Sequence, residues 1–421
     1  MFGKNFGRLI TSLGATTLQG NIAVMAVSGL LTGSYTGMLN TIIQPFTLSL
    51  GLSLAALGIL QSLGNRYGGL AGAIVQPVGG YLSDIFGRRI VVLAGSALAM
   101  ASMSFFLLAA LSHISFILLP AFLLYGTSLL SLPASQVLIA ETVGLDYGKM
   151  KVAFSIVFLF SNIPAAFTAF AGGVMADNLG YYVVFALAVS LEIANFTLYT
   201  LRLKETRNVI ELRHREEVLR GILGRLASAL TPPRGLSGYF SAFAIDLFAF
   251  SITGYIIYGM IATTYHFSDA EIGLISGVYF VVLVIGQIPA TRLMLRIGTK
   301  RSIVLSEILS VVQMSGFVFA RTLPAFIILA AIWAFTSVAW IPAAQSMLMT
   351  VASSDRRAEI TGKLAAFRGV IAFPAPIIGG ILFQTFGFSG PPVASAVGAF
   401  CALLMIIKFL PSERVAGKLL T

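Results

Sequence analysis

The chain is 421 residues long; 57% of its residues are hydrophobic, 10% are charged, and its formal net charge is +11. With a mean hydropathy of +0.92, it has too little polar surface to cover a soluble domain of this length. Its single cysteine excludes a disulfide framework and a cysteine-based metal cluster.

Apolar segments of spanning length follow one another along the chain. Because about 20 apolar residues cross the hydrocarbon of a bilayer, we predict twelve transmembrane helices, near residues 19–48, 54–82, 90–111, 115–142, 150–175, 181–201, 238–264, 270–294, 302–320, 323–351, 361–386 and 391–410. Residues 1–17 run into the first span without a signal-peptide cleavage pattern, so we expect no segment to be removed. The chain is therefore predicted to be an all-α integral membrane protein.

Residues 202–236 form the one long connection, which is polar and strongly charged. Apolar side chains recur there at near-helical spacing: Val209, Leu212, Leu219, Leu223 and Leu226. This pattern fits an amphipathic helix on the membrane surface, and a simple tether fits it equally well. We expect an N-terminal six-helix bundle at 1–201, this linker at 202–236 and a C-terminal six-helix bundle at 237–421.

The positions of the 27 Lys and Arg residues predict the orientation. When successive connections are placed on alternating sides, Arg321 falls on one side, Arg66 and Arg368 fall inside spans, and the remaining 24 fall on the side of both termini. Basic residues collect on the cytoplasmic side of a membrane protein. We therefore expect both termini and the linker in the cytoplasm, in a cell (plasma or inner) membrane, and we do not attribute the net charge to binding of nucleic acid.

The two halves of the chain repeat each other. Three prolines recur 209 to 212 residues later: Pro77 as Pro289, Pro133 as Pro342 and Pro164 as Pro374. Because proline removes a helical hydrogen bond and bends the helix, matched bends suit two bundles that rock around a shared cavity. Gly29, Gly33 and Gly37 repeat every four residues in the first span, which favours close packing against another helix.

The loop between the second and third spans carries the most specific motif. It reads Gly80-Tyr-Leu-Ser-Asp84-Ile-Phe-Gly87-Arg88-Arg89 and matches the pattern G-x-L-x-D-x-x-G-R-R. With this motif, the twelve spans and the internal repeat, nearly the whole chain resembles the major facilitator superfamily (MFS) of secondary transporters. The resemblance implies two pseudo-symmetric six-helix bundles, transport by alternating access and no cofactor.

The resemblance also implies that this loop acts as a conformational latch on the cytoplasmic side. Asp84 would cap the start of the eleventh span, and the arginines would bridge to an acid at the end of the fourth, either Glu141 or Asp146. In the second-half copy of the loop, Leu295 stands near the place of the acid. We therefore expect the latch in the first half, with Gly80 and Gly87 shaping its turn.

Ionisable residues at membrane depth are costly and are candidates for function. Arg66 lies twelve residues into the second span, flanked by Asn65 and Tyr67, with Gln61 about one turn away. A guanidinium there suits a carboxylate, phosphate or sulfonate group, whereas pairing with a buried acid or with helix-end carbonyls is the alternative. We expect Arg66, Asn65, Tyr67, Gln61 and Arg368 to bind the substrate.

Asp246 and Arg368 lie at similar depth in the seventh and eleventh spans. They would either form a structural ion pair, or Asp246 would take up and release the coupled proton while Arg368 responds. We predict proton coupling at Asp246. Glu192 and Glu307 fall in the sixth and ninth spans, and we expect structural roles for both.

Catalysis is not expected. The chain has no metalloprotease, phosphate-binding-loop or nucleophile-elbow motif, and His113, His214 and His266 are too scattered for a metal site. We therefore expect no enzyme, no metal and no ATP hydrolysis, so that a gradient must drive transport. The expected function is proton-coupled transport of a small organic solute, preferably an organic anion, by a monomer in the lipid bilayer.

Three other functions stay open. The first is a drug/proton antiporter that exports amphiphilic compounds, although the fourth span lacks a basic residue and the fifth lacks a Gly-Pro motif. The second is a flippase for lipids or glycolipids, and the third is a non-transporting receptor built on the same fold. A sugar-porter motif is echoed only weakly, by Lys204-Glu205-Thr206-Arg207.

Overall fold

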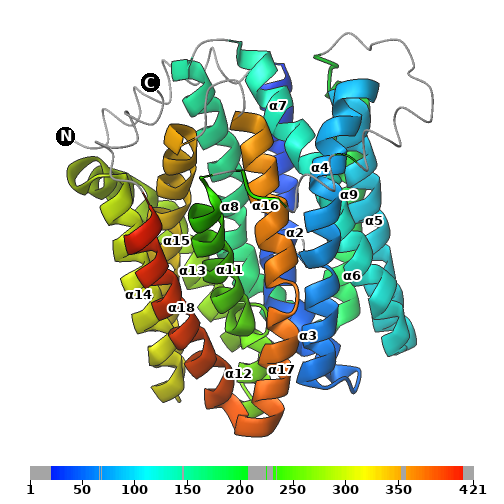
Figure 1. The fold of residues 1–421 in the computed structure, drawn as a ribbon. Helices are drawn as coiled ribbons and strands as arrows, with labels where there is room; N and C mark the ends of the chain where they lie inside the picture. The colour runs from blue at the N-terminus through cyan, green and yellow to red at the C-terminus, as the bar shows by residue number, and fades with distance from the viewer. Residues whose placement is uncertain are drawn as a thin grey trace, which may run out of the picture.

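The computed structural model describes residues 20–65, 67, 69–144, 147–206, 224, 231–233, 235–351 and 357–410. Within these ranges the chain forms helices and no strand (Figure 1). The elements of the first half are α2 (Asn21–Ser49), α3 (Leu54–Leu63), α4 (Gly69–Phe86), α5 (Arg88–Ser112), η1 (Ser115–Ile117), α6 (Leu118–Thr127), η2 (Ser128–Leu130), α7 (Ser131–Val143), α8 (Tyr147–Leu179) and α9 (Tyr181–Arg202). Those of the second half are α11 (Ser237–Gly254), α12 (Ile257–Tyr265), α13 (Asp269–Ile297), α14 (Thr299–Phe319), α15 (Leu323–Val351), α16 (Arg357–Ala372), α17 (Ala375–Phe386), η3 (Gly387–Ser389) and α18 (Gly390–Phe409).

The described chain runs along the bundle in twelve legs, as predicted. Ten segments of it are long and apolar enough to cross a membrane. One of them, residues 360–409, holds two antiparallel legs, because the chain turns back at η3. The remaining leg consists of α3 and α4. Neither helix is counted among the ten spanning segments, because the leg is interrupted between residues 63 and 69. The all-α membrane fold is confirmed.

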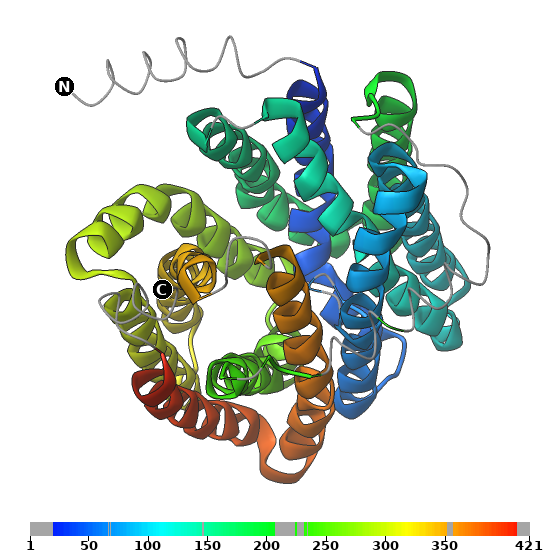
Figure 2. The same cartoon turned by 45° about the horizontal axis from the view of Figure 1, so that its top comes forward.

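The two ends of the bundle are named here after a residue that lies at each. The Arg88 face is the end where α2 begins, α4 ends and α5 begins at Arg88. The Asp269 face is the opposite end, where α8 ends and α13 begins at Asp269. Figure 2 looks toward the Arg88 face and shows the helices of the first half on one side and those of the second half on the other.

Small residues let the helices approach one another closely. The predicted role of Gly33 and Gly37 is confirmed, because a Cβ atom on either would overlap the backbone of α8 at Ser161 or Ala165. Between the halves, a Cβ on Gly58 of α3 would overlap the Pro376 carbonyl of α17. The halves therefore meet along two seams, α3 and α4 against α16 and α17, and α8 against α13.

Hydrogen bonds between the halves gather toward the Asp269 face. The Asn40 side-chain amide on α2 donates to the hydroxyl of Ser276 on α13 at 2.9 Å, and the Gly259 amide on α12 donates to the side-chain oxygen of Gln44 at 2.9 Å. At the face itself, Asp177 of α8 accepts two backbone amides of α13. These bonds hold the halves together on that side of the bundle.

Candidate functional site

A cavity lies in the middle of the bundle, beside the breaks that separate α3 from α4 and α11 from α12. A third leg is interrupted between α16 and α17. Backbone groups freed at such breaks are tolerated at membrane depth where protein or a polar cavity satisfies them, and transporters use them to build binding sites. The cavity is lined from both halves, with four amide side chains from the first: Asn40, Gln44, Gln61 and Asn65.

The rest of the described lining is mostly aromatic and carries no Asp, Glu, Lys or Arg. The rings are Tyr67, Phe122, Tyr125, Tyr255, Tyr258, Tyr279 and Trp333. Rings with a hydroxyl or an indole N–H combine an apolar face with a polar edge. The lining therefore suits a ligand that is itself flat, apolar over most of its surface and able to form a few hydrogen bonds.

Asn65 organises the break in the second leg. Its side-chain amide donates to the carbonyl of Gln61 at 2.7 Å, and its side-chain oxygen accepts the backbone amide of Tyr67 at 2.7 Å. One side chain thus satisfies a freed backbone group on each side of the interruption. The sequence predicted a continuous helix here, because no proline stands between Leu63 and Gly69 to indicate the break.

Three of the residues expected to bind substrate therefore line the cavity, namely Gln61, Asn65 and Tyr67. The Tyr67 ring is half exposed and stacks on the ring of Tyr255 across the two halves, with centroids 5.7 Å apart and planes 17° from parallel. Arg66, on which the expectation of an anionic substrate rests, lies outside the described residues.

Arg368 of α16 is paired with Asp246 of α11. Its Nη2 atom is 3.3 Å from Asp246 Oδ2, and its Nε atom donates to the carbonyl of Phe243 at 3.0 Å. The guanidinium also lies 4.8 Å from the centroid of a Trp340 ring, close enough for a cation–π contact. The pair is largely buried, since the two side chains are 19% and 16% exposed.

Glu307 of α14 belongs to the same cluster, although the sequence predicted only a structural role for it. Its Oε1 atom accepts the indole N–H of Trp340 at 2.9 Å, and its carboxyl interacts electrostatically with that of Asp246. Its Oε2 atom is buried and has no hydrogen-bond partner. In the structure α14 begins at Thr299, three residues before the predicted start of the ninth span.

This cluster of Asp246, Glu307 and Arg368 lies within electrostatic reach of the cavity. Tyr255, which lines the cavity, interacts electrostatically with both Asp246 and Arg368. The two carboxyls and the one guanidinium of this cluster carry one more negative charge than positive charge unless a proton is bound. Binding or release of a proton by these carboxyls would therefore change the strength of the attraction between Asp246 and Arg368.

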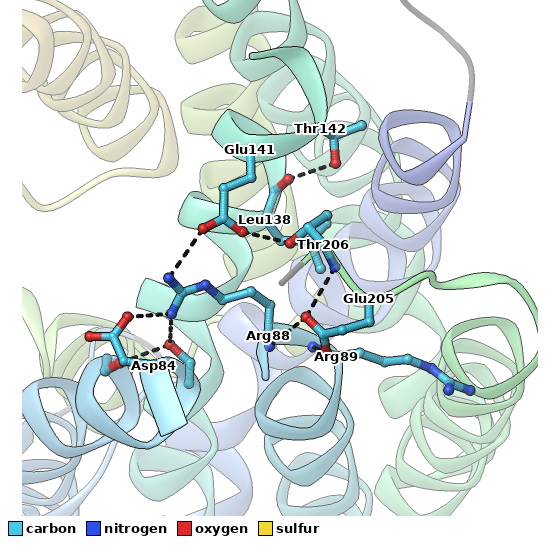
Figure 3. Close-up of polar contacts among 10 residues, drawn as sticks. Asp84, Arg88, Arg89, Leu138, Glu141, Thr142, Glu205 and Thr206 are labelled. Atoms are coloured by element: carbon cyan, nitrogen blue, oxygen red, sulfur yellow. Dashed lines mark hydrogen bonds and ion pairs between the residues drawn. The ribbon is translucent and has the colours of Figure 1, made fainter. Parts of the chain in front are cut away.

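The predicted latch residues meet at the Arg88 face (Figure 3). Arg88 is 5% exposed and donates to Asp84 Oδ1 at 2.7 Å, to the Ser83 hydroxyl at 2.7 Å and to Glu141 Oε1 at 3.2 Å. The bridge from the motif to Glu141 is thus present. Asp146, and residues 352–356 before α16, where Asp84 was expected to form a cap, lie outside the described residues.

Glu205 joins the predicted latch residues, although sequence reasoning missed it. Its two carboxylate oxygens accept the backbone amides of Arg88 at 2.9 Å and Arg89 at 3.0 Å, so it caps the start of α5, where Gly87 has a φ of 97°. Anions are favoured at a helix N-terminus because its amides are free and its dipole is positive there. In the sequence, Glu205 stood out only as part of the weak match to a sugar-porter motif at residues 204–207.

Thr206 and Arg89 complete the contact between the latch and the end of the sixth leg. The Thr206 hydroxyl donates to Glu141 Oε2 at 2.6 Å, so Glu141 joins Thr206 to Arg88. Arg89 donates to the carbonyl of Thr200 at 2.7 Å. Of the two arginines, Arg88 makes the bridge to the fourth leg, whereas Arg89 holds the end of α9.

Comparison with known proteins agrees with the fold and the motif. The model of the Major Facilitator Superfamily matches residues 25–251 and 238–420. Multidrug resistance protein MdtG of Salmonella arizonae is 25% identical over 376 residues, which are 84% of this chain and 87% of that protein. The protein of the same name from Citrobacter koseri is 26% identical over 373 residues, 84% and 86% of the two chains.

Solved structures of transporters share the fold. The human organic anion transporter MFSD10 (TETRAN) superposes with a TM-score of 0.68 over 92% of this chain and 98% of its own, at 14% identity. A peptide transporter POT in complex with sulfate gives a TM-score of 0.73 over 95% of both chains, also at 14% identity. At such low identity these likenesses show the fold alone.

Proposed function

The chain belongs to the major facilitator superfamily, which makes it a multi-span membrane transporter, and we propose that it carries amphiphilic aromatic compounds by proton-coupled alternating access. The two halves enclose the cavity and are joined on the Asp269 face. Rocking of the halves would break these bonds and open the cavity toward the Asp269 face. In this scheme the proton gradient supplies the energy.

The observation that carries the substrate class is the stacked pair of Tyr67 and Tyr255. One ring comes from each half, and half of the Tyr67 side chain is exposed. A flat aromatic ligand inserted beside these rings would contact both halves at once, so its binding would depend on their relative position. The names of the MdtG relatives, which are multidrug resistance proteins, support the same class.

A small organic anion is the second candidate, and a specific position favours it. Arg66 stands in the sequence between Asn65 and Tyr67, both of which line the cavity. An unpaired guanidinium at membrane depth is costly, so an anion would be expected to neutralise it during part of the cycle. The two candidates therefore depend on neighbouring but different side chains.

Thermal stabilisation of the purified protein separates the two candidates, because a ligand that binds the folded state raises its apparent stability. Ethidium would serve as the aromatic cation. Naphthalene sulfonate would serve as the sulfonate anion and benzoate as the small carboxylate anion. We expect stabilisation by ethidium that is lost in Tyr67→Ala and retained in Tyr67→Phe and Arg66→Gln. Stabilisation by the anions alone, lost in Arg66→Gln, would replace the first candidate with the second.

The cluster of Asp246, Glu307 and Arg368 is our proposed site of proton coupling. A proton bound between the two carboxyls would weaken the attraction of Asp246 for Arg368, which lies 3.3 Å away in this conformation. Because Asp246 is on α11 and Arg368 on α16, this attraction links the helix whose last residue, Gly254, lines the cavity to a second helix of the same half. The electrostatic contact of both groups with Tyr255 gives ligand binding a route to influence the proton.

We place the Arg88 face on the cytoplasmic side of a bacterial-type inner membrane. The support is the distribution of Lys and Arg, since basic residues are retained on the cytoplasmic side. In that orientation, the hydrogen bonds between the halves close the outer side. The structure then corresponds to a state in which the outer gate is shut.

A further inference from the structure

The first half contains a buried acid that the proposed coupling site does not use. Glu192 of α9 is 1% exposed, and its Oε1 atom accepts hydrogen bonds from the hydroxyl of Ser96 on α5 and from the Asn195 side-chain amide, the latter at 3.1 Å. The hydroxyl of Tyr35 on α2 lies beside the same carboxyl. Within the described residues, no Lys, Arg or His is paired with it.

Two oxygen atoms of this cluster lack a donor. Glu192 Oε2 and Asn195 Oδ1 are both buried without a hydrogen-bond partner of ordinary geometry. Buried polar atoms are nearly always paired, and an unpaired one costs about 1–3 kcal/mol. A carboxylate can only accept hydrogen bonds, whereas a protonated carboxyl also donates one. A proton on Glu192 would therefore supply the donor that the cluster lacks and remove an uncompensated charge from the membrane interior.

The internal repeat places this cluster where the second half has its acids. Tyr35 stands 211 residues before Asp246, and Ser96 stands 211 residues before Glu307, within the offsets shown by the repeated prolines. In the first half these two positions carry hydroxyl groups, and the carboxyl reaches them from α9 instead. Each half therefore has one buried acidic cluster at the corresponding place in its fold.

Tyr35 and Tyr125 offer a route between Glu192 and the cavity. Tyr35 interacts electrostatically with Tyr125 of α6, and Tyr125 lines the cavity. Tyrosine hydroxyls both donate and accept, so they can pass a proton along such a route. The other titratable group near the carboxyl is Tyr199, whose hydroxyl is 2.5 Å from that of Ser28 and which does not line the cavity.

We propose that Glu192 is a second proton-binding site, which exchanges its proton with the cavity through Tyr35 and Tyr125 during the transport cycle. When the proton leaves, the hydrogen bonds from Ser96 and Asn195 to Oε1 remain to support the carboxylate. The transport role rests on the proposed function, since it takes the proton as the coupling ion. The binding of the proton itself does not depend on which substrate is carried.

Infrared difference spectroscopy tests the site directly, because a protonated carboxyl has its own carbonyl stretch. The full-length protein in lipid nanodiscs would be stepped between high and low pH without any substrate. We expect a carboxyl band that titrates in the wild type and in Asp246→Asn but is missing in Glu192→Gln. A wild-type spectrum that matches that of Glu192→Gln at every pH would overturn the proposal, because Glu192 would then never change its proton.

Ser96→Ala keeps the test decisive if Glu192→Gln does not fold, since loss of the Ser96 hydrogen bond should shift the same band rather than remove it.

The route is tested by the rate at which the band responds to a pH jump. Tyr125→Phe should slow it by roughly tenfold or more, whereas Tyr199→Phe, the matched loss of a hydroxyl, should leave it unchanged. Equal rates in the two variants would contradict a path through Tyr125. Failure of this site would leave coupling at Asp246 intact, because that cluster is measured through its own variant.

Discussion

Asp177 and Asp269 join the two halves of the protein at one end of the bundle. One carboxylate oxygen of Asp177, on α8, accepts the backbone amide of Asp269 at 3.0 Å, and the other accepts that of Ala270 at 2.8 Å. These amides begin α13 and belong to the four at a helix start that have no partner within the helix. The contact places a charge of the first half on the positive end of a helix dipole in the second half.

Asp177→Asn should weaken this closure. The asparagine keeps one acceptor but loses the charge and one of the two bonds, which should shift the balance toward states with an open Asp269 face by roughly two- to fivefold. Spin-label distances between the end of α8 and the start of α13 would measure the shift. Asn178→Ser is the control, since Asn178 is exposed and bonds only to the carbonyl of Val174 in its own helix. An unchanged distance distribution in Asp177→Asn would remove the gating role.

Asp84→Asn tests the latch at the Arg88 face. Arg88 would lose its 2.7 Å ion pair but keep Ser83 and Glu141, so the fold should survive while the state with a closed Arg88 face loses population and cycling slows. The effect should be modest, about 1 kcal/mol or less, because the Asp84 side chain is 42% exposed. Distances between the ends of α4 and α16 at this face would decide the question. A mutant distribution identical to that of the wild type would show that Asp84 only shapes its own loop.

Glu205→Gln should lower stability rather than transport specificity. Glutamine can cap only one of the two amides of α5 and carries no charge, which should cost about 0.5–2 kcal/mol of stability. Thermal unfolding of the purified protein would show this as a lower midpoint. Thr206→Val, which loses the bond to Glu141 but leaves the cap in place, should shift the midpoint less. The reverse order would indicate that the cap contributes little.

Asp246→Asn should separate substrate exchange from accumulation. Without a carboxylate that takes up a proton, proteoliposomes should no longer accumulate ethidium against its gradient when a pH gradient is imposed, yet exchange of ethidium at equal concentrations should continue. Glu307→Gln should behave in the same way if the two carboxyls share the proton, since they interact electrostatically. Normal pH-driven accumulation in both variants would leave Asp246 as a structural partner of Arg368.

The orientation predicts which positions react from outside the cell. In a Cys401→Ser background, which removes the single exposed thiol, cysteines at Ser112, Asn178 and Ser389 should react with an impermeant maleimide. A cysteine at Glu205, on the Arg88 face, should react only after the membrane is opened. The opposite labelling pattern would show that the protein has the inverse orientation, with the closed gate on the cytoplasmic side.

Much of this molecule can be predicted from the sequence because hydropathy and proline spacing are local properties. They predicted the twelve legs, the internal repeat, the packing of Gly33 and Gly37 and the motif around Arg88, each within one stretch of chain. The approximate depth of Asp246 and Arg368 followed in the same way, because depth needs only a count from the end of a helix.

Only the tertiary structure decided which of these groups meet. The break at Asn65 depends on side-chain hydrogen bonds that have no periodic signal, and the cap by Glu205 joins residues 117 and 116 positions apart. Glu307 joined Asp246, and Glu192 joined Ser96, because helices distant in the sequence turn particular faces toward each other. In a membrane helix, apolar residues surround the whole circumference, so the pattern that reports burial in lipid does not report which face packs against a neighbour.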